Sequence, residues 1–258
     1  AAFNVTSALP GNDKPATQSE AARFLSQATF GYSVNDINRL TQTGYTAWID
    51  EPVAKPITRH HPGFAEARGA TYGGFYKDWV LPQDVNASQF KVFTQGEDQL
   101  RQKMVYALSQ IFVVSTNSPE FWPVQRIATS YLDMLTANAL GSYRSLLEGV
   151  TLSPAMGTYL TYVANRKEDP IAGTIPDQNF AREVMQLFTI GLFKLNPDGT
   201  TVLDNGAPVP TFTAADVIGG SRVMTGWNYT NQTTIWNPNY HPWPYKDVQT
   251  QQLIAFAN

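Results

Sequence analysis

The chain has 258 residues, of which 15% are charged and 12% aromatic, with a formal net charge of −3 and no cysteine. This length allows one large domain or two small ones, and the apolar content is too high for a disordered protein. The small negative charge argues against binding to nucleic acid or an anionic membrane. The lack of cysteine excludes thiol catalysis, thiolate metal sites and disulfides, and no apolar run could span a membrane.

An aperiodic arm, residues 1–16, opens the chain and contains proline, glycine and asparagine. Two helices should follow, because a Thr or Ser is twice followed three residues later by an acidic residue, the spacing of a capping box. These pairs are Thr17 with Glu20 and Ser33 with Asp36. Gly44 is suited to end the second helix, and a short third helix is expected over 45–51.

A long segment rich in proline and glycine, residues 52–86, comes next. A loop of this length inside a compact domain is usually functional or mobile. It contains His60 and His61, beside Arg59. Adjacent residues rarely ligate one metal from a regular element, and no third histidine lies near in sequence. We therefore expect an exposed pair of loop histidines and no metal site.

The middle of the chain has the strongest helical periodicity. Helices are expected over 97–115, 124–138 and 142–152. A fourth should open at Ser153, which has the N-cap position ahead of a proline. In the first of these helices, one broad face is apolar and consists of Leu100, Met104, Val105, Leu108, Ile111 and Phe112.

The segment 177–192 predicts a helix with two unlike faces, one of them apolar at helical spacing. Its polar residues fall at i, i+3, i+4 and i+7 and form one stripe: Asn179, Arg182, Glu183 and Gln186. Arg182 and Glu183 are adjacent, so each needs a partner from another element. The nearby predicted helices offer Glu148 and Arg101 for this role.

The stripe has two interpretations. A buried structural network, which we favour, would need charge-assisted hydrogen bonds to offset desolvation. In the catalytic interpretation, Glu183 is a general acid or base and Arg182 an anion clamp. Gln186 and Asn179 would then orient a substrate.

The segment 193–212 has the one clear β pattern. Strand-like Phe-Lys-Leu leads into an Asn-Pro-Asp-Gly turn, which is followed by Thr-Thr-Val-Leu and then by a second turn sequence, Asp-Asn-Gly. A last helix should run from its N-cap at Thr213 to about Val223. The tail beyond Trp227 is loop-like and aromatic, and such rings either stack on sugars or strap the tail over the core. The fold class is thus mainly α, a multi-helix globular domain with one small β-hairpin and long irregular loops.

Several segments, in this order, resemble the bacterial DUF1800 family. They are ARFLSQATFG, LRQKMVYALSQIFVVS, YLDMLTANALGSYRSLLEGVTLSPAMGTYL, and NFAREVMQLFTIGLFKLNPDGT through PTFTAADVIGGSRVMTGW. The resemblance covers about residues 19–227. It implies an exported bacterial protein, periplasmic or extracellular, often encoded beside a DUF1501 (sulfatase-like) partner protein. The resemblance does not identify an activity or a cofactor.

Members of that family usually extend further and carry a His-Asp then Lys motif after the Thr-Gly-Trp segment. We therefore expect this chain to be the N-terminal part of such a protein. Its expected organisation is an arm over 1–16, a helical DUF1800-like domain over 17–227, and an aromatic loop-rich tail over 228–258 that leads toward a C-terminal part.

Two functions fit these features. The first is a hydrolase-like enzyme that acts on an extracellular polymer or glycan, with Glu183 and Arg182 at its centre. The second is a non-catalytic binding or scaffold protein of the cell envelope or extracellular matrix, which would use the aromatic tail.

Overall fold

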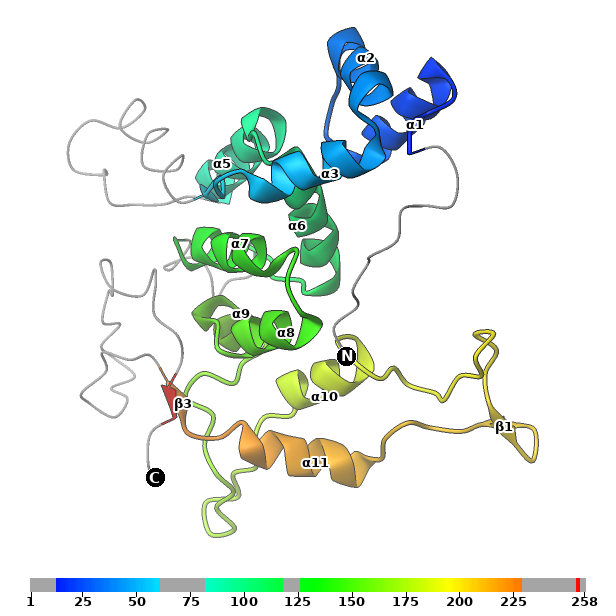
Figure 1. Ribbon diagram of the computed structural model, residues 1–258. Helices are drawn as coiled ribbons and strands as arrows, with labels where there is room; N and C mark the ends of the chain where they lie inside the picture. The colour runs from blue at the N-terminus through cyan, green and yellow to red at the C-terminus, as the bar shows by residue number, and fades with distance from the viewer. Residues whose placement is uncertain (1–12, 61–81, 118–125, 229–253, 256–258) are drawn as a thin grey trace, which may run out of the picture. The chain divides into compact units, whose positions relative to one another are not determined.

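The protein is mostly helical, as predicted (Figure 1). The computed structural model describes residues 13–60, 82–117, 126–228 and 254–255. These residues form ten α-helices and two short two-stranded antiparallel β-ladders. None of the described helices has the length and apolar character that crossing a membrane requires.

The chain divides into two compact units. Unit 1 comprises residues 1–110 and 128–149, and unit 2 comprises residues 111–127 and 150–258. The predicted boundaries of the arm, the helical domain and the tail stay a prediction.

Unit 1 begins with the helices α1 (Gln18–Ala28), α2 (Val34–Thr43) and α3 (Tyr45–Ala54). The predicted caps of the first two are confirmed, since each N-cap hydroxyl accepts a hydrogen bond from the backbone three residues on. In α2 the box is reciprocal, because the Asp36 carboxylate also accepts from the backbone N–H of Ser33 at 2.7 Å. Gly44 ends α2 with φ of 90°, a conformation that favours glycine.

A hydrophobic cluster joins these three helices. Its buried members are Ala21, Leu25, Ala28, Leu40 and Trp48. Phe24 packs against the cluster and meets the Trp48 ring edge-on, with ring centroids 5.0 Å apart. Truncation of a buried leucine in such a cluster typically costs about 2–5 kcal/mol, so this core fixes the arrangement of α1–α3.

The predicted loop over 52–86 is partly wrong. The helix α3 continues past Pro52 to Ala54, and α5 (Pro82–Gln95) begins inside the segment expected to be irregular. The buried residues of α5 are Val85, Ser88, Val92 and Phe93. That spacing is helical, whereas Asn, Ser, Thr and Val are only modest helix formers. Burial therefore stabilises α5 more than local propensity does.

Three helices follow within a few residues of their predicted bounds: α6 (Gln99–Ile111), α7 (Arg126–Asn138) and α8 (Tyr143–Thr151). The buried side of α6 differs from the expected apolar face. Arg101, Gln102 and Val105 are buried, while Met104 and Ile111 are exposed. Polar side chains thus occupy part of the interior of unit 1.

The helices of unit 2 are α9 (Pro154–Tyr159), α10 (Asn179–Gln186) and α11 (Ala214–Val223). The helix α10 is shorter than predicted, because the backbone N–H groups of Phe188 and Gly191 bond back to Glu183 and Met185 in a wider turn. Gly191 then leaves the helix with φ of 75°. Helices α10 and α11 lie side by side (Figure 1).

Small residues allow the close packing of α10 and α11. A Cβ atom added at Gly220 of α11 would lie 3.2 Å from the Cβ of Ala181 on α10. Aromatic contacts complete the core of unit 2, where the ring centroids of Tyr162 and Phe180 are 4.3 Å apart. The Tyr162 hydroxyl donates to the backbone oxygen of Thr151 at 2.6 Å, so this buried hydroxyl is satisfied.

The predicted hairpin is confirmed. Its strands β1 (Leu203–Asp204) and β2 (Ala207–Pro208) are antiparallel. Asn205 and Gly206 between them both have positive φ, 49° and 81°, as a type I′ turn requires. A second ladder was not expected: β3 (Trp227–Asn228) pairs with β4 (Ile254–Ala255). The rest of the predicted aromatic tail, 229–253 and 256–258, lies outside the described residues.

Candidate functional site

The predicted polar stripe lies on α10, in unit 2. At its start, the Asp177 carboxylate accepts from the Asn179 backbone N–H at 2.8 Å and from the Thr161 hydroxyl at 2.9 Å. The Asn179 side-chain amide donates to the same Thr161 oxygen at 3.0 Å. Thr161 has a positive φ of 61°, which is strained for a β-branched residue. Asn179 therefore belongs to a local network that holds the start of α10.

The charged pair of the stripe is less tightly bound. Arg182 is exposed, and Glu183 and Gln186 are partly buried. The Glu183 Oε2 atom is buried and has no hydrogen-bond partner among the described residues. The buried structural network that we favoured for the stripe would require a hydrogen-bond partner for this oxygen, and the described residues do not supply one.

The proposed supports, Arg101 and Glu148, belong to unit 1. Arg101 is buried, donates to the backbone oxygen of Val53 at 3.0 Å, and has its Nε atom 3.6 Å from an Asp98 carboxylate oxygen. Glu148 is exposed on α8. Arg101 therefore already has a counter-ion within its own unit, and the assignment of either residue to the stripe stays a prediction.

Unit 1 contains a buried polar cluster around the segment 53–60. The Asp98 carboxylate accepts from the Thr58 backbone N–H at 3.1 Å, and the Gln102 amide donates to the Thr58 oxygen at 3.1 Å. The His60 backbone N–H donates to Asp133 at 2.6 Å. Side chains of α6 and α7 thus satisfy the backbone hydrogen-bonding groups of this irregular segment, as a neighbouring strand would do in a sheet.

The expectation of an exposed histidine pair is wrong for His60, which is completely buried. Its ring meets Phe93 edge-on at 5.6 Å, and neither ring nitrogen has a hydrogen-bond partner among the described residues. Burial lowers the pKa of His60 from 6.5 to about 4, while Gln102 and the Asp98 charge oppose this shift. His61 and His241 lie outside the described residues.

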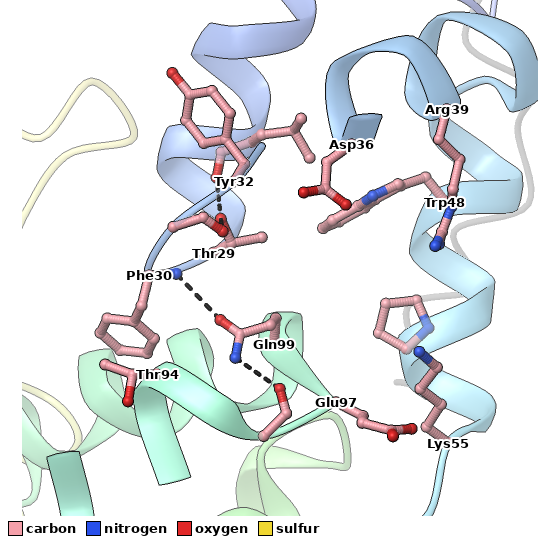
Figure 2. A pocket seen from close by; sticks show the side chains of 14 residues that line it. Thr29, Phe30, Tyr32, Asp36, Arg39, Trp48, Lys55, Thr94, Glu97 and Gln99 are labelled. Atoms are coloured by element: carbon pink, nitrogen blue, oxygen red, sulfur yellow. Dashed lines mark hydrogen bonds between the residues drawn. The ribbon is translucent and has the colours of Figure 1, made fainter. Parts of the chain in front are cut away.

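A cavity of about 480 Å³ opens in unit 1 (Figure 2). It has the size of a small-molecule site. Its aromatic lining comes from Phe30, Tyr32 and Trp48, and its charged lining from Asp36, Arg39, Lys55 and Glu97. Figure 2 shows Asp36, Arg39, Trp48 and Lys55 on the side of α2 and α3, across from Thr94 and Gln99.

Several polar groups of the cavity are committed to the fold. Gln99 accepts from the Phe30 backbone N–H at 3.3 Å and donates to the Gly96 oxygen at 2.7 Å. Thr94 donates to the Phe90 oxygen at 2.7 Å. Lys103, which does not line the cavity, lies 4.7 Å from the centroid of the Phe30 ring. These contacts shape the wall and leave few groups free for a ligand.

The two cations of the cavity share one acidic partner. Glu51 on α3 forms ion pairs with Arg39 and with Lys55, the latter at 3.3 Å. Asp36 is held by Ser33, whose backbone N–H and hydroxyl donate to its Oδ2 atom and lower its pKa below the usual value. Glu97 is exposed, and its side chain has no ion pair or hydrogen bond within the described part of the chain.

Sequence reasoning missed this cavity. Its residues come from the interiors of α1–α3, including Leu25, Arg39 and Trp48, and from connections between helices. No single periodic pattern marks such a set of positions. The available signal was the aromatic and charged character of the short connections, in particular Phe30 and Tyr32 between the first two helices. Among the described residues, no three His, Asp or Glu side chains are grouped to hold a metal ion.

The model of a family described as "Protein of unknown function (DUF1800)" matches residues 23–253. Searches of curated proteins and of solved structures found nothing that matches the chain.

Proposed function

The chain belongs to the DUF1800 family, whose description assigns no activity, and we propose that it binds saccharide units of an extracellular polymer in the unit 1 cavity. The observation that carries this proposal is the cavity itself, in which aromatic rings stand beside carboxylates and cations. We name it the α1–α3 cavity.

A saccharide is the ligand class that suits such a lining. A sugar ring has an apolar face that packs on an aromatic ring and an edge of hydroxyl groups that bond to carboxylates and ammonium groups. Tyr32, with 42% of its surface exposed, offers an accessible ring. Trp48 is only 6% exposed and serves as a wall. Asp36 and Glu97 supply acceptors for hydroxyl groups.

The cellular setting is part of the same proposal. We place the protein in the periplasm or outside the cell, where a polymer ligand is available. A DUF1501-type protein is the proposed partner, and co-purification of the two from the native host tests that pairing. These statements rest on the family resemblance.

The binding proposal is tested by calorimetric titration with a panel of oligosaccharides. Tyr32→Ala should weaken binding about tenfold, because loss of an aromatic contact costs about 0.5–1.5 kcal/mol. Phe90→Ala is the matched control, since Phe90 is an exposed aromatic residue of unit 1 that does not line the cavity. Equal affinities for the two variants, or no binding by the wild-type protein, would refute the proposal.

A second function is favoured by one observation in unit 2, the buried Oε2 atom of Glu183 without a hydrogen-bond partner. A carboxylate that the fold leaves unsatisfied is available to act as a general acid or base in hydrolysis. Glu183→Gln should then abolish release of reducing ends from a polysaccharide substrate and leave the unfolding midpoint almost unchanged. A variant that unfolds much more easily but still releases reducing ends at the wild-type rate would contradict a catalytic role.

A further inference from the structure

The charged side chains around the α1–α3 cavity determine which class of saccharide would bind there most tightly. Three carboxylates, Asp36, Glu51 and Glu97, stand against two cations, Arg39 and Lys55. Glu51 does not line the cavity but forms ion pairs with both cations. Arg39 also acts on Asp36 through its charge, whereas Glu97 has no ion pair within the described part of the chain. The three carboxylates exceed the two cations by one negative charge.

Each of the two carboxylates of the lining is placed to meet a ligand. Asp36 uses its Oδ2 atom for the cap of α2, and its lowered pKa keeps it ionised at neutral pH. Figure 2 shows Asp36 on the same side of the cavity as Trp48. Glu97 reaches the same space from the connection between α5 and α6. Acidic groups therefore enter the cavity from two sides.

The aromatic lining acts in the same direction. Tyrosine and tryptophan rings attract a cation through their negative faces. A group that combines a sugar ring with a positive charge would therefore satisfy both parts of the lining. A uronic acid would instead add a negative charge where carboxylates already outnumber cations.

We infer that the α1–α3 cavity selects saccharides that carry a free, protonated amino group over neutral and acidic ones. This inference rests on the proposed saccharide binding and specifies its ligand class. The amino group pairs with Asp36 and Glu97, while the ring packs against Tyr32.

The experiment compares three tetrasaccharides of different charge by calorimetric titration at about pH 6, where aspartate and glutamate are ionised. The probes are chitosan tetrasaccharide, with free amines, chitin tetrasaccharide, with acetylated amines, and oligogalacturonate, with carboxylates. The free amine form should bind about fivefold to tenfold more tightly than the acetylated form, and this ratio should fall with added salt.

Variants that each remove one charge distinguish an effect of the cavity carboxylates from an effect of the net charge of the protein. Glu97→Gln should reduce the preference for the amine several-fold, and Lys55→Gln should increase it. Asp50→Asn is the matched control, because Asp50 is exposed on α3 outside the cavity and its removal changes the net charge by the same amount as Glu97→Gln. The Asp50→Asn variant should prefer the free amine over the acetylated form by the same factor as the wild-type protein.

The outcomes distinguish this inference from the proposal on which it rests. If the neutral or acidic probe binds as tightly as the amine, or if Asp50→Asn and Glu97→Gln behave alike, the selectivity is overturned and saccharide binding stands. If none of the three probes binds, saccharide binding in this cavity fails as well.

Discussion

Replacement of His60 by leucine tests whether a buried imidazole makes unit 1 sensitive to acid. His60 is completely buried, and its ring nitrogens have no hydrogen-bond partner among the described residues. Leucine therefore removes only the weak polar contact of the ring with Gln102, which opposes the shift of the His60 pKa. The backbone bonds of residue 60 to Asp133 and Ser88 are kept. At neutral pH we expect the variant to be within about 1.5 kcal/mol of the wild-type protein.

The pH dependence follows from the two states of His60. Its pKa is about 4 in the folded protein, against an ordinary value of 6.5, so the unfolded chain binds the proton more readily. Above pH 6.5 both states are neutral, and below it stability is lost until the pH reaches about 4. The full loss is about 3 kcal/mol, of which about 2.5 kcal/mol is reached at about pH 4.5.

Urea unfolding followed by circular dichroism measures this effect. The difference in unfolding free energy between His60→Leu and the wild-type protein should change by about 1.2 kcal/mol for each pH unit between about 6 and 4.5, and should level off below about pH 4. Taking the difference removes the contributions of nearby charged groups, Asp98, Arg101 and Asp133. Parallel pH profiles for the two proteins, or an NMR titration of His60 near its ordinary pKa, would show that the ring is not held neutral by burial.

Two further changes probe the framework of unit 1 by chemical and thermal unfolding. Asp98→Ala should cost about 3–5 kcal/mol, because it leaves the buried charge of Arg101 without its counter-ion; a cost below 1 kcal/mol would contradict this pairing. Gly44→Ala should cost about 1–3 kcal/mol, since φ is +90° and the new Cβ would lie 2.6 Å from Asp13. Gly31→Ala, with nothing within 4 Å of its new Cβ, is the matched control, and equal losses for both glycine variants would refute the strain argument.

Elements specified by local interactions were predictable from the sequence. The helices α2 and α11 begin with Ser-x-x-Asp and Thr-x-x-Asp, and in both the capping box forms in full. The hairpin is likewise set by its turn, in which Asn205 and Gly206 adopt positive φ. In each case a few neighbouring residues determine the backbone, so no knowledge of the tertiary packing is needed.

Elements that depend on tertiary packing were not predictable in the same way. The helix α5 is made of modest helix formers, and burial of Val92 and Phe93 stabilises it. The backbone of the buried His60 is held by Asp133, which is 73 residues away in sequence. Both features need partners that no local pattern identifies.

The candidate sites show the same division. A helical repeat of polar residues identified the stripe on α10, and the structure places Glu183 there with an unsatisfied carboxylate oxygen. The α1–α3 cavity has no sequence repeat, because its lining comes from several separate helices and the connections between them. Only the tertiary packing places Tyr32, Trp48 and Glu97 around the same cavity.

The central claim is that the α1–α3 cavity binds a saccharide, and two-dimensional NMR of the ¹⁵N-labelled protein during titration with chitosan tetrasaccharide tests it most directly. We expect saturable shifts of the Trp48 indole N–H and of the backbone amides of Phe30 and Tyr32. An unchanged spectrum, or shifts centred on α10 around Glu183, would contradict the claim.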